Sequence, residues 1–122
     1  RTCYDHFAGR FGVALADALV ARDLVELTDF GGVVTNAGMA FFRDQKIDVS
    51  AGAAKRAFCR PCLDWSERRY HIAGVVGVSI CRTAFERGWV ARISGTRAIS
   101  VTTAGRRTFR DVFNVDWKDG GS

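Results

Sequence analysis

The chain has 122 residues and a formal net charge of +5, with 48% hydrophobic and 25% charged residues. This balance is typical of a folded soluble protein, and the single proline argues against a disordered chain. The uncharged run at residues 72–81 is shorter than the about 20 apolar residues that a bilayer requires, so we expect no membrane partner. Because the chain starts at Arg1 with no leader, we expect a cytoplasmic piece of a longer protein.

Charge is distributed unevenly along the chain. Residues 1–52 carry five basic and seven acidic side chains, whereas residues 53–122 carry thirteen basic and six acidic ones. The positive excess of the second half favours an acidic partner such as DNA. A solvated basic face that aids solubility is the alternative interpretation.

The first half predicts a helix, a hairpin and a second helix. The apolar stripe of residues 6–22 indicates the first helix, and the glycines of residues 29–32 indicate a turn between two short strands. Thr35 or Asn36 is expected to cap the second helix. The expected elements are a helix at 6–22, strands at 24–28 and 33–35, and a helix at 37–45.

The second half predicts the same order after a connection at residues 50–59. Asp64 is expected to cap a short helix in an insertion at residues 65–70, and Gly88 is expected to end a long buried helix. Thr102 or Thr103 is expected to cap the last helix. The expected elements are a helix at 71–87, strands at 89–93 and 97–101, a helix at 104–113 and a tail at 118–122.

Three sequence motifs occur in both halves, in the same order. Arg-Thr-Cys-Tyr-Asp at residues 1–5 corresponds to Arg-Pro-Cys-Leu-Asp at 60–64, and His-Phe-Ala-Gly-Arg-Phe-Gly-Val at 6–13 corresponds to His-Ile-Ala-Gly-Val-Val-Gly-Val at 71–78. Val-Thr-Asn-Ala-Gly then corresponds to Val-Thr-Thr-Ala-Gly. We therefore predict one α+β domain, mostly helical and winged-helix-like. Two tandem helix–β-hairpin–helix repeats (residues 1–49 and 60–117) would pack with pseudo-two-fold symmetry, their glycine-bearing helices against each other.

The cysteines and histidines form the strongest candidate for a chemical site. Cys59 and Cys62 form a single Cys-x-x-Cys pair, and a four-ligand metal site would need a second pair from Cys3 with His6 or His71. A thiol-bound metal ion, a redox-active thiol pair, a structural disulfide and unreactive buried thiols all remain open. The two histidines, at equivalent positions, would serve otherwise as helix caps.

Two longer strings carry a family resemblance. The segment from His71 through Phe-Glu-Arg-Gly-Trp-Val and a basic hairpin to Val-Thr-Thr-Ala-Gly is similar to the recognition helix and wing of bacterial winged-helix regulators. Arg-Thr-Cys-Tyr-Asp-His-Phe-Ala-Gly, Cys-Leu-Asp-Trp-Ser-Glu-Arg-Arg and Ala-Gly-Arg-Arg resemble the C-terminal region of long ArsR-type transcriptional regulators. The resemblance implies that an N-terminal winged helix-turn-helix precedes this chain, reads DNA and mediates dimerisation.

The resemblance implies that this chain is the regulatory part of a DNA-binding regulator. Its role would be to sense an effector or to stabilise a homodimer. The effector would be a small molecule or a metal ion, and Trp65, Tyr70 and Trp89 are candidates to line its cavity. The alternatives are direct DNA binding by the basic second half and a structural extension without a ligand. Because the chain lacks a recognisable catalytic motif, we do not expect an enzyme. The arginines expected to contact DNA phosphates are Arg68, Arg69, Arg92, Arg97, Arg106 and Arg107.

Overall fold

The computed structural model describes residues 1–3, 6–49 and 58–117. This part of the chain contains four helices and four separate two-stranded antiparallel hairpins, which makes it a mixture of α and β structure. The order hairpin, helix, hairpin, helix occurs twice. The elements are β1 (Thr2–Cys3), β2 (His6–Phe7), α1 (Gly9–Ala21), β3 (Val25–Thr28), β4 (Gly31–Val34), α2 (Asn36–Asp44), β5 (Arg60–Asp64), β6 (Arg69–Ala73), α3 (Gly74–Glu86), β7 (Val90–Arg92), β8 (Ile99–Val101) and α4 (Thr103–Asp111).

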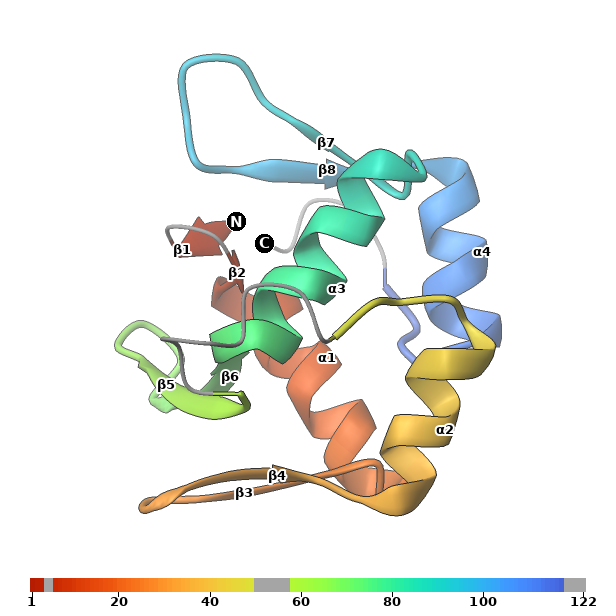
Figure 1. The fold of residues 1–122 in the computed structure, drawn as a ribbon. Coiled ribbons are helices and arrows are strands. Elements are labelled where there is room, and N and C mark those ends of the chain that lie inside the picture. The colour runs from red at the N-terminus through yellow and green to blue at the C-terminus, as the bar shows by residue number, and fades with distance from the viewer. Residues whose placement is uncertain (4–5, 50–57, 118–122) are drawn as a thin grey trace.

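The two long helices occupy the middle of the molecule. Figure 1 shows the β3–β4 hairpin at one end and the β7–β8 hairpin at the opposite end, with α1 and α3 between them and α2 and α4 along one side. The relation of the two halves by duplication, the winged-helix likeness and the division at residues 50–59 stay predictions from the sequence. Most of that connection and the tail at residues 118–122 lie outside the described residues.

A hairpin precedes each long helix at the point where the sequence predicted the helix itself. His6–Phe7 and Arg69–Ala73 are strands, so the predicted helices over residues 6–22 and 71–87 were wrong at their starts. At Gly74 φ is +79°, a left-handed conformation that allows the chain to turn from the strand into the helix. The predicted end of α3 is confirmed, because Gly88 follows the helix with φ +72°.

Threonine side chains cap the two short helices. Thr35 Oγ1 accepts a hydrogen bond of 3.0 Å from the backbone N–H of Gly38, and Thr102 Oγ1 accepts one of 2.9 Å from Gly105. Each hydroxyl also donates to a backbone carbonyl beside the preceding hairpin. The caps therefore fix both the start of each helix and its position on the hairpin before it.

Both halves contribute side chains to one apolar core. Phe11 from α1 meets Phe109 from α4 with ring centroids 4.8 Å apart, and Phe41 from α2 meets Phe113 at 5.3 Å. Phe11, Phe109 and Phe113 are fully buried. Because aromatic rings from the two halves pack against each other, their burial stabilises both halves together.

None of the helices in the described part of the chain is long and apolar enough to cross a membrane.

Glycines in α1 and α3 allow very close packing, but against strands rather than against the other helix. A Cβ on Gly12 would lie 2.6 Å from the carbonyl oxygen of Phe7, and a Cβ on Gly77 would lie 2.1 Å from that of Ile72. Phe7 and Ile72 belong to the strand directly before each helix, and each helix also packs against the corresponding strand of the other half, α1 on β6 and α3 on β2. The close approach predicted for these glycines is therefore present, with the strand backbones as the partners.

We expect Gly77→Ala to destabilise the protein by about 1–3 kcal/mol, because the added methyl group cannot fit beside the Ile72 carbonyl. Helix propensity alone predicts the opposite sign, since Ala favours a helix over Gly by about 1 kcal/mol. Urea unfolding followed by circular dichroism measures the difference. Arg82→Ala, at an exposed position of the same helix, is the control and should change stability by less than about 0.5 kcal/mol. An unchanged or raised stability for Gly77→Ala would contradict this packing.

Candidate metal centre

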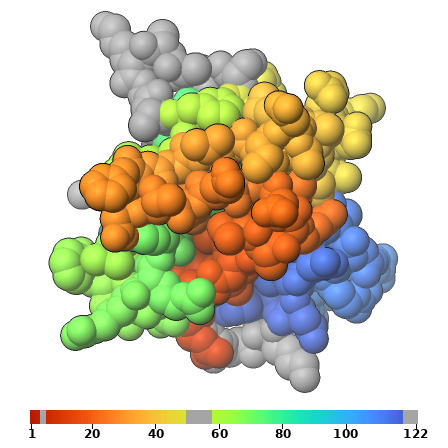
Figure 2. Space-filling view, turned by 90° about the horizontal axis from the view of Figure 1, so that it is seen from below, coloured from red at the N-terminus to blue at the C-terminus, as the bar shows by residue number. Residues whose placement is uncertain are grey.

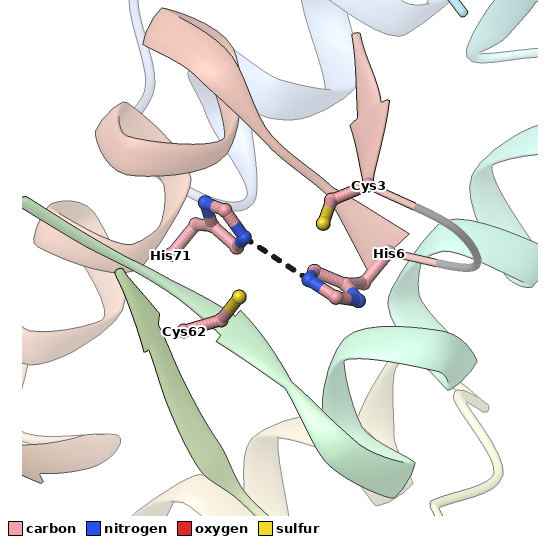
Figure 3. A group of neighbouring side chains, drawn as sticks. All are labelled: Cys3, His6, Cys62 and His71. Carbon is pink, nitrogen blue, oxygen red and sulfur yellow. Dashed lines mark hydrogen bonds between the residues drawn. The ribbon is translucent and has the colours of Figure 1, made fainter. Parts of the chain in front are cut away.

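Two cysteines and two histidines from the hairpins β1–β2 and β5–β6 converge on one point. The ligand atoms of Cys3, His6, Cys62 and His71 all lie within 4.8 Å of one another. Figure 3 shows the four side chains pointing toward a common centre, with the two imidazole rings facing each other. Nε2 of His71 lies 3.0 Å from Nε2 of His6. Each half of the chain thus supplies one thiol and one imidazole.

The strand register explains why each hairpin presents a cysteine and a histidine together. Cys3 is paired with His6 across β1–β2, and Cys62 is paired with His71 across β5–β6. Residues directly opposite each other in an antiparallel pair project on the same face. The sequence spacing differs because β5–β6 continues past the Cys62–His71 pair through Leu63–Tyr70 and Asp64–Arg69 to the turn at residues 65–68, whereas Cys3–His6 is the last pair of β1–β2.

The helices close the site from both sides. The Cβ of His71 lies 3.3 Å from the position that a Cβ on Gly12 would occupy, and the Cβ of His6 lies 3.2 Å from the corresponding position at Gly77. Both histidines are buried and both cysteines are half-buried. The imidazoles therefore come together only because a glycine in the helix of the other half leaves room for each of them.

Asp64 is the residue that orients His71. Its carboxylate is fully buried and lies 3.1 Å from Nδ1 of His71. It also accepts hydrogen bonds from the backbone N–H of Gly9 at 2.6 Å, the hydroxyl of Ser66 at 2.7 Å and the backbone N–H of Glu67 at 3.1 Å. Asp64 was predicted to cap a short helix, but it caps a turn and anchors the start of α1.

This buried environment sets the protonation of Asp64 and His71. Burial by itself raises the pKa of the Asp64 carboxyl, but the hydrogen bonds from Ser66, Gly9 and Glu67 outweigh it and hold that pKa well below its usual range. Burial, together with the neighbouring His6, lowers the pKa of His71 to about 4. His71 is therefore neutral near pH 7. Its Nδ1–H donates to the carboxylate, and its Nε2 lone pair faces the cluster.

The cysteines fall into two environments. Burial and the neighbouring Cys3 thiol raise the pKa of Cys62. Cys59 does not belong to the cluster; it is buried in the apolar core beside Gly32, and this burial raises the pKa of its thiol to about 11. The structure thus brings together four of the five predicted sulfur and nitrogen residues and places Cys59 elsewhere. Cys81 is also buried in the core, as the sequence predicted.

Sequence reasoning did not assign Asp64 to this site. A signal existed, because a cysteine followed two residues later by an aspartate occurs in both halves of the chain. Asp5, the first-half counterpart, lies outside the described residues. The sequence pattern after Asp64 predicts a short helix, so it does not indicate that Asp64 ends a strand. From the end of β5, its side chain reaches the start of α1.

The arginines predicted to contact DNA do not form one surface. Arg92 stacks its guanidinium 4.8 Å from the Phe85 ring centroid and donates to Thr2 Oγ1 at 3.3 Å. Arg69 pairs with Asp17 at 2.9 Å. Figure 1 places the β5–β6 hairpin away from β7–β8 and α4. The remaining candidates are divided between these regions, with Arg68 after β5, Arg97 in the β7–β8 loop, and Arg106 and Arg107 on α4.

The aromatic residues proposed for an effector cavity do not share one. Trp65 is exposed, Trp89 is buried in the core, and of the three only Tyr70 lines a hollow of about 670 Å³. That hollow lies where β3–β4 and β5–β6 run side by side on the face seen in Figure 2. The Tyr70 hydroxyl donates to Asp29 across it. The hollow is open and has charged groups at its rim, with Asp17 and Arg69 among its lining residues.

Comparison with known proteins gives one informative similarity. Over 116 residues the chain is 42% identical to the "Uncharacterized HTH-type transcriptional regulator YdfF" of Bacillus subtilis (strain 168). The alignment covers 94% of this chain and 51% of that protein, so the chain spans about half the length of the curated relative. No protein-family profile matches the chain, and no solved structure matches it.

The two thiol environments predict different alkylation rates. In the native protein with EDTA present, we expect N-ethylmaleimide to modify Cys3 and Cys62 at least tenfold faster than Cys59. With a pKa of about 11, only about one Cys59 molecule in a thousand is a thiolate at about pH 8, and the core also excludes the reagent. Mass spectrometry of timed digests gives the rates. In guanidinium chloride the difference should disappear. Rapid native labelling of Cys59 would contradict the burial seen here.

Asp64→Ala is expected to destabilise the protein by about 3–5 kcal/mol, because it leaves buried donors without an acceptor. The matched control is Asp17→Ala. That carboxylate is 44% exposed and pairs with an exposed Arg69, so its removal should cost less than about 1 kcal/mol. Urea unfolding of both variants measures the two changes. Equal losses of unfolding free energy for the two variants would contradict the stabilising role of the Asp64 hydrogen bonds.

Proposed function

We propose that residues 1–122 form the C-terminal regulatory part of a DNA-binding transcriptional regulator of ArsR type, which acts in the cytoplasm. The observation that carries the proposal is the 42% identity to an HTH-type transcriptional regulator over 94% of this chain. Similarity of this extent points to common ancestry along nearly the whole chain. The role is effector sensing or stabilisation of a dimer, and it leaves the reading of DNA to another part of the longer protein.

The order of the elements supports assigning the reading of DNA to another part of the longer protein. A helix-turn-helix joins two consecutive helices through a turn of about 3–4 residues. In residues 1–3, 6–49 and 58–117, a hairpin separates α1 from α2 and α3 from α4, and the path from α2 to α3 includes β5–β6. The described part of the chain therefore lacks a helix-turn-helix, which is the element that the relative's name assigns to that protein.

The contacts of the basic side chains also favour a regulatory role over direct DNA binding. Arg92 is held by Phe85 and Thr2, and Arg69 is held by Asp17. Asp17 competes with a phosphate for the Arg69 guanidinium, and one N–H of Arg92 already binds Thr2. Direct binding by the second half and a structural extension without a ligand are the alternatives that an experiment has to separate.

Removal of residues 1–122 from the intact regulator should leave its preference for the operator over a scrambled duplex in place. It should also change the dimer dissociation constant or abolish the response to an effector. Fluorescence anisotropy with both duplexes and sedimentation velocity measure these quantities. Loss of the sequence preference with the dimer intact would overturn the proposal in favour of direct reading by this chain. An unchanged dimer and unchanged effector response would overturn it in favour of a structural extension.

Point variants of the intact regulator provide the control. Arg97→Ala/Arg107→Ala removes two exposed guanidinium groups without touching the core. We expect the operator affinity to change by less than about twofold and the salt dependence to stay the same. If both side chains bound phosphates, the slope of log K against log salt concentration would fall by about 0.9 for each lost contact.

A further inference from the structure

We propose that Cys3, His6, Cys62 and His71 bind one zinc ion, which joins the two halves of the chain. The proposal concerns the chemistry of these four side chains and holds whether or not the chain regulates transcription. It rests on three properties of the cluster: the kind of donors, their separation and the hydrogen bond that orients His71. Neither the relative's name nor any comparison assigns a metal to these residues.

The donor set matches the preference of zinc. Two thiolates and two imidazoles are one of the common ligand sets of structural zinc sites, and soft sulfur with borderline nitrogen disfavours Mg²⁺ and Ca²⁺. All four positions are filled by side chains, so none is left for a water or a substrate. The site is therefore of the closed, structural kind rather than the open, catalytic kind.

The distances match a tetrahedron after a small contraction. With metal–nitrogen bonds of about 2.0–2.1 Å and metal–sulfur bonds of about 2.3 Å, neighbouring ligand atoms in a tetrahedral site lie about 3.3–3.8 Å apart. The two Nε2 atoms lie 3.0 Å apart, and no pair in the cluster exceeds 4.8 Å. The widest pair would close by about 1 Å through rotation of the cysteine side chains, and the two Nε2 atoms would separate by about 0.3 Å to reach a tetrahedral spacing.

The hydrogen bond between His71 and Asp64 orients the His71 ring as a ligand. Its Nδ1–H is held by the Asp64 carboxylate, so the lone pair of Nε2 points at the other three donors. A carboxylate on the far nitrogen of a metal-bound histidine fixes the ring and increases its basicity. Asp64 is thus a positioning residue for this site. Its charge is compensated in part by the Arg1 guanidinium at 3.6 Å.

The charge balance also suits a buried site. Binding Zn²⁺ releases two thiol protons, and the ion with two thiolates and two neutral imidazoles carries no net charge. A neutral centre avoids most of the desolvation penalty that an isolated ion would meet in this interior. Because His6 and His71 are 65 positions apart in the chain, the ion would cross-link segments that the unfolded chain holds far apart.

Metal analysis of the reduced 122-residue chain tests the proposal. We expect one zinc per chain after purification from zinc-supplemented cells. We also expect the metal-free chain to bind one Co²⁺, with the intense visible absorption of tetrahedral Co²⁺ and a thiolate charge-transfer band. Zinc at about 100-fold above its dissociation constant should raise the melting temperature by roughly 10 °C. The wild-type Co²⁺ spectrum tests the site without any variant.

Matched cysteine variants assign the ligands. Cys62→Ala should lose the charge-transfer intensity of one thiolate and weaken metal binding at least 100-fold. Cys59→Ala, three residues away and outside the cluster, should keep one metal per chain and the wild-type spectrum. The proposal is overturned if the reduced wild-type chain binds neither metal, or if Cys59→Ala loses as much binding as Cys62→Ala. It is also overturned if Cys3 and Cys62 form a disulfide that persists under reducing conditions.

The two proposals fail independently. A chain without zinc that still changes the dimer constant or the effector response of the intact regulator refutes only the metal site. A chain that binds zinc in an intact protein without operator preference refutes only the regulatory role.

Discussion

The meeting of two buried imidazoles, His6 from β2 and His71 from β6, is the contact on which the arrangement of the halves depends. Their Nε2 atoms lie 3.0 Å apart, and each ring fits beside a glycine of the opposite helix. A side chain on Gly12 or Gly77 would collide with a strand carbonyl before it reached the ring. Close packing of strand, helix and imidazole at this point therefore requires both glycines.

The buried carboxylate of Asp64 fixes the orientation of the His71 ring in this contact. A buried charge is costly unless donors compensate it, and Asp64 has four of them from three segments of the chain. It thereby joins the start of α1, the β5–β6 turn and the His71 ring. The same interaction leaves Nε2 of His71 free of its proton and aimed at two thiols. The hydrogen bonds that hold Asp64 thus also orient one side chain of the proposed metal site.

A ligand that binds between the hairpins stabilises only the arrangement in which both are in place. For a regulatory part of a larger protein, such a link offers a way to couple a bound ion to the relative position of the two halves. The β3–β4 and β7–β8 hairpins lie at opposite ends of the molecule, each directly after the long helix of its own half. The proposed metal site lies where one strand pair of each half meets, so a bound ion would contact both halves.

The sequence by itself determined the order of the later elements in each half, the end of α3 at Gly88 and the burial of Cys81, because these depend on local chemistry. It limited each helix cap to two neighbouring residues, one of which is the observed threonine. Four of the five sulfur and nitrogen residues that it grouped lie together in the structure. It failed at His6 and His71, which it placed in helices, because apolar runs of this length suit a buried strand and a helix equally well. Only the tertiary structure excluded Cys59, recruited Asp64 and separated the arginines. These outcomes depend on which side chains from distant segments meet, and no local pattern encodes that.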